Sequence, residues 1–326
     1  MVETPIPPSA DPLGAALHSL RMSGTFYCRS ELSAPWGLAL PPIQDCLWFH
    51  ILTSGQCRLE ADGCVPLLLQ PGDLALVPHG NGHCLRSEKG SRTPSIQALT
   101  RTAISERYEI LRHGEGGDET TMICGAVSFD HPTARHLIGL LPGAIHIPAT
   151  DSPEREWIQS TVRLITAEAR SLRPGGETVL TRLSDILVIQ AIRSWIASDQ
   201  AARTGWLGAL RDEQIGGALV RIHSAPAHPW TVALLAEECA MSRSSFAARF
   251  TDLVGEPAMQ YVTRWRMQVA LGWLREDAVT VSELASRLGY QSEAAFSRAF
   301  KRIIGVAPGG VRRNFSGRVS SAILSD

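Results

Sequence analysis

Short apolar or alternating runs, broken by turn residues, fill the chain from residue 24 to residue 130. Runs such as CLWFHIL, CRLEA, DLALVP and TTMICGAV are separated by SG, DG, PGD and HGNG. Strands at that spacing, without a helical period, are typical of an antiparallel sandwich or barrel. We predict an all-β domain for this part of the chain.

The pattern changes at residue 153, where apolar residues begin to recur every three or four positions. The stretches EREWIQSTVRLITAEARSL and TVLTRLSDILVIQAIRSWIA follow this amphipathic period, and PGG at 174–176 separates them. They predict a helical hairpin over 153–200. A further helix is predicted from Trp206 to His223, followed by SAPAHP, a proline-containing linker.

The last hundred residues contain an internal repeat. TVALLA at 231–236 returns as TVSELA at 280–285, and SRSSFAARFTDLVG at 242–255 returns as SEAAFSRAFKRIIG at 292–305. Each copy predicts a short helix, a tight turn and a longer helix. A single helix, PAMQYVTRWRMQVALGWLRE, is predicted between the copies, with its proline in the first turn.

Both longer helices are predicted to begin after a capping serine and to bury a stripe of two phenylalanines. The exposed positions of their early turns are Arg243, Ser244, Ala247, Ala248, Glu293, Ala294, Ser297 and Arg298. Small or hydrogen-bonding side chains at these positions leave room for a helix to enter the DNA major groove. The same periodicity also fits a plain helical bundle that binds no DNA.

The order of these elements closely resembles the DNA-binding domain of AraC/XylS-type transcriptional regulators. The matching motifs are Ser242-x3-Phe246-x3-Phe250-x4-Gly255, Tyr261-x4-Arg266-x3-Ala270-x3-Leu274, and Ala285-x3-Gly289-Tyr290-x5-Phe296-x3-Phe300-Lys301-Arg302-x2-Gly305-x2-Pro308. The resemblance covers residues 230–313 and implies two helix-turn-helix units held by the linking helix. Each unit would offer one helix to successive major grooves of double-stranded promoter DNA, about one DNA turn apart.

The resemblance assigns base reading to the exposed residues of the early turns. Arg298 is the strongest candidate, because an Arg side chain binds guanine O6 and N7 with two hydrogen bonds. Phosphate contacts are implied for Arg243, Arg249, Lys301 and Arg302. The first copy departs from the family in offering Ala247 and Ala248 where longer polar side chains are usual. Its recognition is expected to depend on thymine methyl groups, phosphates and DNA shape.

A second resemblance lies in the β region. The stretch from Gly72 to His83 has the form G-x5-P-x-G-x2-H and resembles the second motif of the cupin barrel. Phe49-His50, followed by Ser54-Gly55, resembles part of the first cupin motif without its paired histidines. Residues 124–142 resemble the AraC-type subclass named for its cupin domain. The match over residues 20–150 implies a cupin-like sensor barrel.

Four residues of types that bind metals are predicted inside this barrel. They are Cys28, His50, His83 and Cys124. With Arg29 and Arg86 pointing outward, strand alternation places Cys28 and His83 inside, and the other two lie on apolar strands. Together they match the ligand set of one zinc or other transition-metal ion. Two alternatives stay open: a thiol redox switch, and a small-molecule pocket lined by ordinary buried Cys and His.

Composition adds few constraints. The chain has 326 residues, of which 44 % are hydrophobic and 19 % charged, as in globular proteins. Residues 217–326 hold 13 Lys and Arg against 9 Asp and Glu, whereas the rest of the chain holds 18 against 23. A basic C-terminal third suits a polyanionic partner. Seven scattered Cys, no apolar stretch of membrane-spanning length and no recognisable signal sequence predict a cytoplasmic protein with reduced thiols and no membrane partner.

We therefore predict an α+β, multidomain chain with three parts. These are a cupin-like β-barrel sensor over residues 1–152, a helical hairpin linker and dimerisation region over 153–225, and an all-α DNA-binding domain with two helix-turn-helix units over 226–316. The predicted function is a homodimeric transcriptional activator controlled by a small-molecule, metal or redox effector. The alternative is a metal-dependent cupin enzyme with a helical oligomerisation domain. The missing histidine pair and the lack of other catalytic motifs argue against an enzyme.

Overall fold

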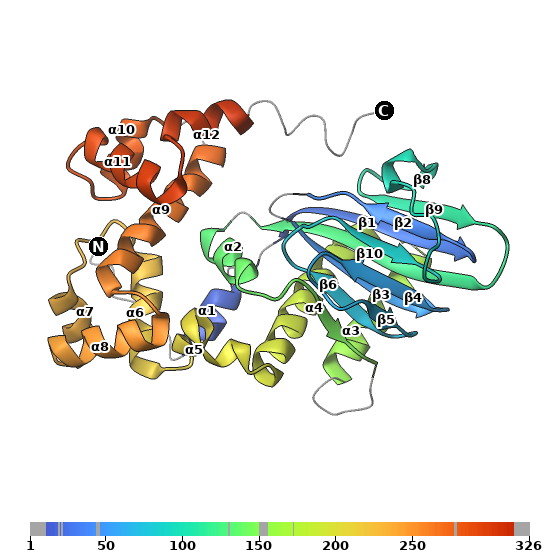
Figure 1. The fold of residues 1–326 in the computed structure, drawn as a ribbon, viewed down its shortest axis with the longest axis horizontal. Coiled ribbons are helices and arrows are strands. Elements are labelled where there is room, and N and C mark those ends of the chain that lie inside the picture. Colours follow the sequence, from blue (N-terminus) through green and yellow to red (C-terminus); the bar gives the residue numbers. More distant parts are fainter. Residues whose placement is uncertain are drawn as a thin grey trace. The chain divides into compact units, whose positions relative to one another are not determined.

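The computed structural model describes residues 11–18, 20, 22–43, 46–129, 131–149, 156–171, 173–276 and 279–315. The chain divides into two compact units. The β unit is residues 19–198, and the helical unit combines residues 1–18 with residues 199–326. Figure 1 labels most elements of both units along the chain.

Two β-sheets form the centre of the β unit. Their strands are β1 (Met22–Ser33), β2 (Gly37–Leu40), β3 (Cys46–Ser54), β4 (Cys57–Ala61), β5 (Leu67–Leu69), β6 (Leu74–Val77), β7 (His83–Arg86), β8 (Arg101–Ala103), β9 (Tyr108–Gly114), β10 (Glu119–Phe129) and β11 (Ile145–Ile147). The larger sheet has the order β11-β6-β3-β10-β1-β9-β8, and the smaller has the order β2-β7-β4-β5. The paired strands are antiparallel except β1 and β9, which are parallel. The predicted cupin-like β domain is confirmed.

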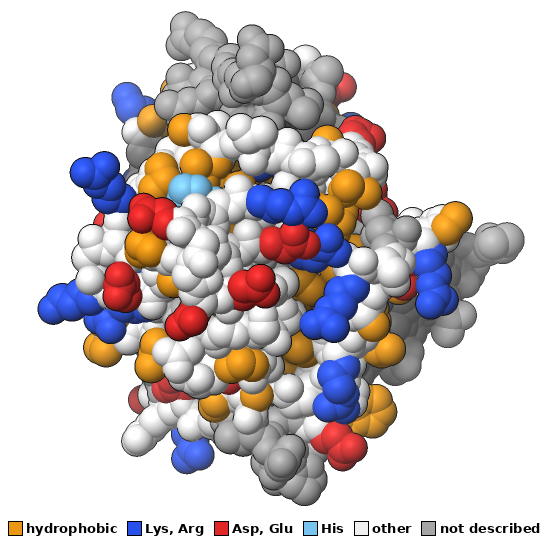
Figure 2. Space-filling view, turned by 90° about the vertical axis from the view of Figure 1, so that its right-hand side faces the viewer, with side chains coloured by type: hydrophobic (Ala, Val, Ile, Leu, Met, Phe, Trp, Pro, Cys, Tyr) orange, Lys and Arg blue, Asp and Glu red, His pale blue; other side chains and the backbone are white. Residues whose placement is uncertain are grey.

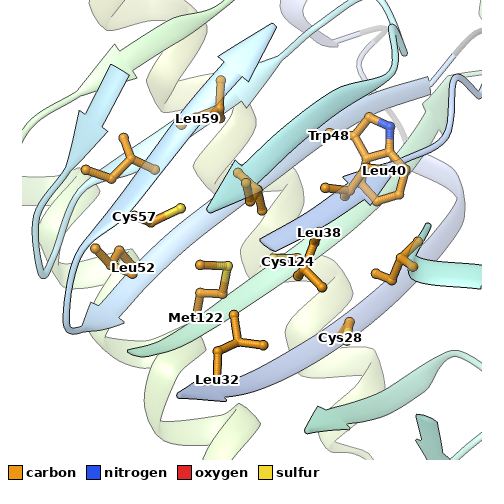
Figure 3. Packing of buried hydrophobic residues seen from close by; sticks show 14 of the residues in the cluster. Cys28, Leu32, Leu38, Leu40, Trp48, Leu52, Cys57, Leu59, Met122 and Cys124 are labelled. Carbon is orange, nitrogen blue, oxygen red and sulfur yellow. The ribbon is translucent and has the colours of Figure 1, made fainter. Parts of the chain in front are cut away.

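One apolar core lies between the inner faces of the two sheets. Leu38 and Leu59 enter it from the smaller sheet, and Leu32, Trp48 and Met122 enter it from the larger one. Figure 3 shows these side chains together with three cysteines of the same cluster. The interior of the β unit is therefore filled by packed side chains in this region.

A helical hairpin covers the outer face of the larger sheet. Its helices are α3 (Glu156–Arg170) and α4 (Gly176–Ser198), and the shorter α2 (Pro132–Gly139) follows β10. Tyr108 Oη donates to the carbonyl of Ala169 at 2.6 Å, and Arg29 Nη1 donates to the same carbonyl at 3.3 Å. Residues 46–52 of β3 are all buried. Cover on both faces explains the unbroken apolar run CLWFHIL.

The helical unit contains the repeat. Its helices are α1 (Pro12–His18), α5 (Gly205–Ala209), α6 (Glu213–Ser224), α7 (Val232–Glu238), α8 (Arg243–Val254), α9 (Ala258–Glu276), α10 (Val281–Arg287), α11 (Glu293–Ile304) and α12 (Pro308–Phe315). The pairs α7–α8 and α10–α11 are the two predicted helix-turn-helix units, and α9 is the predicted linking helix. The all-α C-terminal domain is confirmed.

Residues 153–225 do not form one separate region in the structure. Helices α3 and α4 belong to the β unit, whereas α5 and α6 belong to the helical unit. The single helix predicted from Trp206 to His223 is also two helices. The break between the two helices lies at Asp212. Its side chain accepts hydrogen bonds from the amides of Gln214 and Ile215 and so caps α6.

The surface carries charge of both signs. In the space-filling view of Figure 2, acidic and basic side chains are interspersed, with hydrophobic side chains between them. Among the residues described, no helix combines the length and the hydropathy required to cross a membrane.

Candidate nucleic-acid interface

The two longer helices of the repeat, α8 and α11, begin and end alike. Ser242 and Ser292 each accept a hydrogen bond from the amide three residues later, at 3.1 and 3.2 Å. Both helices end at a glycine in the left-handed conformation, Gly255 with φ of 87° and Gly305 with φ of 88°. Both serine caps are confirmed.

The buried stripes of these helices also match. Phe246 and Phe250 on α8, and Phe296 and Phe300 on α11, are fully buried. Each pair fixes the rotation of its helix about its own axis, because turning the helix would expose both rings. The opposite face of each helix is thereby presented to solvent.

The residues predicted to contact DNA lie on those presented faces. Arg243, Ser244, Ala248, Arg249, Glu293, Ala294, Arg298, Lys301 and Arg302 are exposed, and Ala247 and Ser297 are half-buried. Small side chains on the first turns reduce the diameter of both helices at their N-terminal ends, which suits insertion into a groove about 12 Å wide. The geometry is compatible with the predicted reading of DNA.

Arg249 has partners within the protein. Its Nε donates to Oδ2 of Asp212 at 3.0 Å, and its Nη1 donates to Oε1 of Gln214 at 3.3 Å. Gln214 donates in turn to the carbonyl of Cys239, at 2.8 Å, in the turn between α7 and α8. Because the Asp212 side chain is mostly buried, this ion pair is screened less than a surface pair. Arg249 ties α8 to α6.

The other cations of the predicted interface are differently placed. Within the described parts of the chain, the side chains of Arg243, Arg298 and Lys301 take part in no hydrogen bond or ion pair. Arg298 and Lys301 both belong to α11, whereas α8 contributes only Arg243. The second helix thus offers more cationic side chains to a phosphate or a base than the first.

Three of the four residues predicted to lie in the sensor form one buried chain of contacts. His50 Nδ1 lies 3.1 Å from Cys124 Sγ, and His50 Nε2 lies 2.8 Å from His83 Nε2. His83 Nδ1 lies 3.2 Å from the carbonyl of Asn81, so this nitrogen is the donor and Nε2 is the acceptor. His50 then donates through Nε2, and the Cys124 thiol donates to His50 Nδ1.

Burial keeps these groups neutral. It lowers the pKa of His50 well below its ordinary value, lowers the pKa of His83 to about 4, and raises the pKa of Cys124 well above its ordinary value. Both ring nitrogens of His50 already have protein partners. In the described ranges, no group of three or more His, Cys, Asp or Glu side chains could hold a metal ion. The arrangement does not fit the predicted zinc site.

Cys28 joins this cluster from the neighbouring strand. It stands directly opposite Cys124 in the antiparallel register of β1 and β10. Residues in such positions have Cβ atoms about 4.5–5.5 Å apart. Burial raises the pKa of Cys28 to about 11, with a smaller opposing contribution from its contact with Ser30. Both side chains are therefore protonated thiols at neutral pH.

Sequence reasoning missed the residues that hold α8. Asp212 and Gln214 precede Arg249 by 37 and 35 residues, and no motif connects them. The available signal was the position of Asp212 just before an amphipathic segment, which is typical of a helix cap. That signal locates the start of α6 but does not identify Arg249 as a second partner of the same carboxylate.

A cupin-like β domain and two capped helix-turn-helix units on a linking helix together define the class of the protein, a transcriptional regulator with a helix-turn-helix DNA-binding domain. Residues 11–197 match the family model described as Cupin, and residues 235–314 match the model described as Helix-turn-helix domain.

Full-length relatives agree with this class. The chain is 36 % identical over 270 residues to a putative AraC-like transcription regulator of Streptomyces lividans, covering 82 % of this chain and 86 % of that protein. It is 33 % identical over 307 residues to another from Streptomyces antibioticus, covering 93 % and 99 %. It is 28 % identical to the RCS-specific HTH-type transcriptional activator RclR of Escherichia coli, covering 81 % and 83 %. The chain belongs to the family of AraC-like transcription regulators.

Proposed function

We propose that this regulator binds promoter DNA in a sequence-specific manner through α8 and α11, and that its β unit controls the binding. The observation that carries the proposal is the pair of serine-capped helices whose phenylalanines are buried and whose small, polar or cationic residues face solvent. Such helices fit the major groove, and Arg298 can read a guanine there. Its relatives are transcriptional regulators, which argues for this role over the cupin enzyme considered above.

Selection from a pool of random DNA duplexes tests the proposal. The full-length protein is expected to enrich a bipartite sequence whose halves are about one helical turn, roughly 10 bp, apart. Binding that does not discriminate among sequences at physiological salt would contradict it. A promoter carrying the enriched sequence then tests the sign of control: we propose activation, as in the Escherichia coli relative, and reduced transcription would contradict that sign.

We further propose that the β unit responds to an oxidant through Cys28 and Cys124. Their opposed positions on β1 and β10 support a disulfide, which needs Cβ atoms about 3.5–4.5 Å apart and therefore only a small approach of the two strands. The reaction joins the two sulfurs, releases two protons and transfers two electrons to the oxidant. High thiol pKa values slow this reaction, so weak oxidants and brief exposure are expected to have little effect.

DNA binding before and after oxidant treatment tests this mode of control. The wild type is expected to lose two titratable thiols and to change its affinity for the selected DNA, and a reductant should reverse both changes. Cys28→Ser/Cys124→Ser should not respond, whereas Cys64→Ser, which alters a half-buried cysteine outside the core, should respond like the wild type. A double variant that responds to the oxidant as the wild type does would contradict this role of Cys28 and Cys124.

We also propose that the regulator is a homodimer that associates through the α3–α4 hairpin. Packing on the β sheet buries Ile158 and Leu187 but leaves Trp157 75 %, Leu164 57 % and Ile186 46 % exposed. Thr161 Oγ1 donates to Oε1 of Gln190 across the hairpin at 3.1 Å. Trp157 lies four residues before Thr161 and Leu164 three residues after it, so these two apolar side chains share one side of α3. Exposed apolar patches of this kind mark interfaces.

Light scattering tests the dimer at micromolar concentration. Trp157→Ser/Leu164→Ser is expected to give a monomer, whereas the matched pair Val65→Ser/Leu68→Ser, in exposed residues at β4–β5, should not change the mass. A monomeric wild type would contradict the proposal.

A further inference from the structure

The two helix-turn-helix units meet at a joint formed by three segments of the helical unit. These segments are the loop 225–230 between α6 and α7, the middle of α9, and the turn 288–291 between α10 and α11. The loop runs directly into the first unit, and the turn belongs to the second. Contacts across this joint therefore fix how the two units are oriented relative to each other.

Arg266, on α9, is the central side chain of the joint. Its Nε donates to the carbonyl of Pro226 at 2.7 Å, and its Nη2 donates to the carbonyl of His228, also at 2.7 Å. Its guanidinium carbon lies 5.9 Å from the ring centroid of Tyr290, over the ring. A planar guanidinium is suited to two fixed hydrogen bonds and a stacking contact at once. One side chain thus bonds the loop and touches the turn.

Both ends of this chain of contacts are anchored in their own unit. On the loop side, Trp230 is buried and donates through Nε1 to the carbonyl of Ala225 at 2.9 Å, and the next residue, Thr231, caps α7. On the turn side, the ring of Tyr290 meets the ring of Phe296 edge to face at 5.6 Å. Phe296 is the first buried residue of α11, so a shift at Tyr290 would reach that helix.

Gly289 shows how closely the loop approaches the turn. A Cβ at this position would lie 2.6 Å from the carbonyl oxygen of Ala227, closer than real Cβ atoms come to such an atom. The residue also has φ of 75°, which favours glycine. In the first unit, Ala240 has the equivalent place in the turn, with φ of 51°. Since Ala240 carries a Cβ there, positive φ alone does not require glycine; the close approach of the loop adds that requirement.

We infer that Arg266 and Gly289 are positioning residues that set the separation and rotation between α8 and α11, and thereby the spacing of the two DNA half-sites that the protein accepts. The inference rests on the DNA binding proposed above. Neither residue needs to touch DNA. Arg266 holds the loop and the turn together, and Gly289 lets them meet without a shift of the backbone. With the joint intact, α11 can enter the major groove only when its half-site lies at one angle about the DNA axis relative to the half-site of α8.

Spacing variants of the selected duplex test this inference with the full-length protein. Inserting 2 bp between the halves rotates the second half-site by roughly 70°, since one turn takes about 10.5 bp. The wild type is expected to lose about 10- to 100-fold in affinity, because linking two binding modules raises affinity by about 10²–10⁴. Arg266→Ala should bind an isolated half-site as the wild type does, should bind the best-spaced duplex more weakly, and should lose less than about threefold on respacing.

Arg264→Ala is the matched control. Arg264 lies on the same helix, but its Nε donates to Glu256 Oε1 at 2.8 Å and its guanidinium lies over Tyr261, away from the joint. Its removal should therefore leave the dependence on spacing as in the wild type. Gly289→Ala tests the joint independently of charge and should flatten that dependence as well. Ala240→Gly, which changes the equivalent turn position of the first unit, should not flatten it.

The outcomes separate this inference from the proposed function. A wild type that selects no sequence would overturn both. A wild type with a strong spacing preference that Arg266→Ala and Gly289→Ala retain would overturn the inference alone. Loss of binding to an isolated half-site by both variants, with lost helical circular dichroism, would also overturn it, since the two residues would then be needed for the fold and not for the spacing.

Discussion

The two helix-turn-helix units have the same buried structure and different exposed surfaces. The phenylalanine rings of α8 lie 5.5 Å apart at 44°, and those of α11 lie 5.7 Å apart at the same angle. The serine caps and the terminal glycines also correspond. Because these buried and capping residues determine the helix positions, both units can keep one fold while their solvent-facing residues differ.

The two helices differ at two adjacent positions of their middle turn. Arg298 of α11 corresponds to Ala248 of α8, and Ala299 corresponds to Arg249. Each helix thus has one arginine at this level. The side chain of Arg298 faces solvent with no partner among the described residues, whereas Arg249 is bound to Asp212. From this comparison we propose that the second unit supplies base recognition, whereas the first supplies a fixed surface for phosphates and DNA shape.

The first prediction concerns the support of the first unit and has the largest expected effect. A fragment of residues 199–316 should fold and bind the selected DNA, whereas residues 226–316 should protect only the half-site read by α11. The shorter fragment lacks α5 and α6, whose buried side chains such as Trp206 and Leu219 each contribute about 1.5–3 kcal/mol. Urea unfolding and DNA footprinting measure both effects. Equal footprints of the two fragments would show that α8 needs no support from α6.

Local signals explain which parts of this fold the sequence predicts well. The repeat predicted α7 and the capping serines of α8 and α11 correctly, because caps and amphipathic stripes depend on residues three or four positions apart. Strand alternation likewise placed Cys28 and His83 in the interior. These inferences require no knowledge of the tertiary structure.

Local patterns of this kind do not predict contacts between segments that are distant in the sequence. The parallel pairing of β1 with β9 joins segments about eighty residues apart, and nothing in their pattern selects that partner. The same holds for the bond between Arg249 and Asp212. For His50, the apolar strand predicted burial but not the contacts of its two ring nitrogens with Cys124 and His83, the arrangement that does not fit the predicted zinc site.

The second prediction compares the two DNA half-sites. Randomising the half-site under α11 should weaken binding more than randomising the half-site under α8, because each lost base contact costs about 1–3 kcal/mol. The alanines at 247 and 248 offer no hydrogen bond to lose. Fluorescence anisotropy with the two randomised duplexes gives the ranking. The reverse ranking would reject the division of roles between the helices.

The third prediction compares the two arginines. Arg298→Ala should cost about 1–3 kcal/mol of binding and relax the preference at one base pair. Arg249→Ala should lower the stability of the helical unit by about 1 kcal/mol or less, because the Arg249 side chain is half exposed and water weakens its attraction to the mostly buried Asp212. It should leave base preference unchanged. Repeating the DNA selection with each variant decides this, and a weakening by Arg298→Ala that is uniform over all sequences would make Arg298 a phosphate contact.

The smallest effects are expected at the two serine caps, where the units should respond alike. Ser242→Ala and Ser292→Ala each remove one acceptor for an amide of the first helical turn. Such changes cost about 1 kcal/mol, and replacement by glycine costs only a few tenths. Hydrogen exchange of the first-turn amides, measured in the full-length protein, should show equal loss of protection in α8 and α11. A clearly larger loss in α11 would mean that the support of α8 by α6, through the bond between Asp212 and Arg249, extends to the first turn of α8.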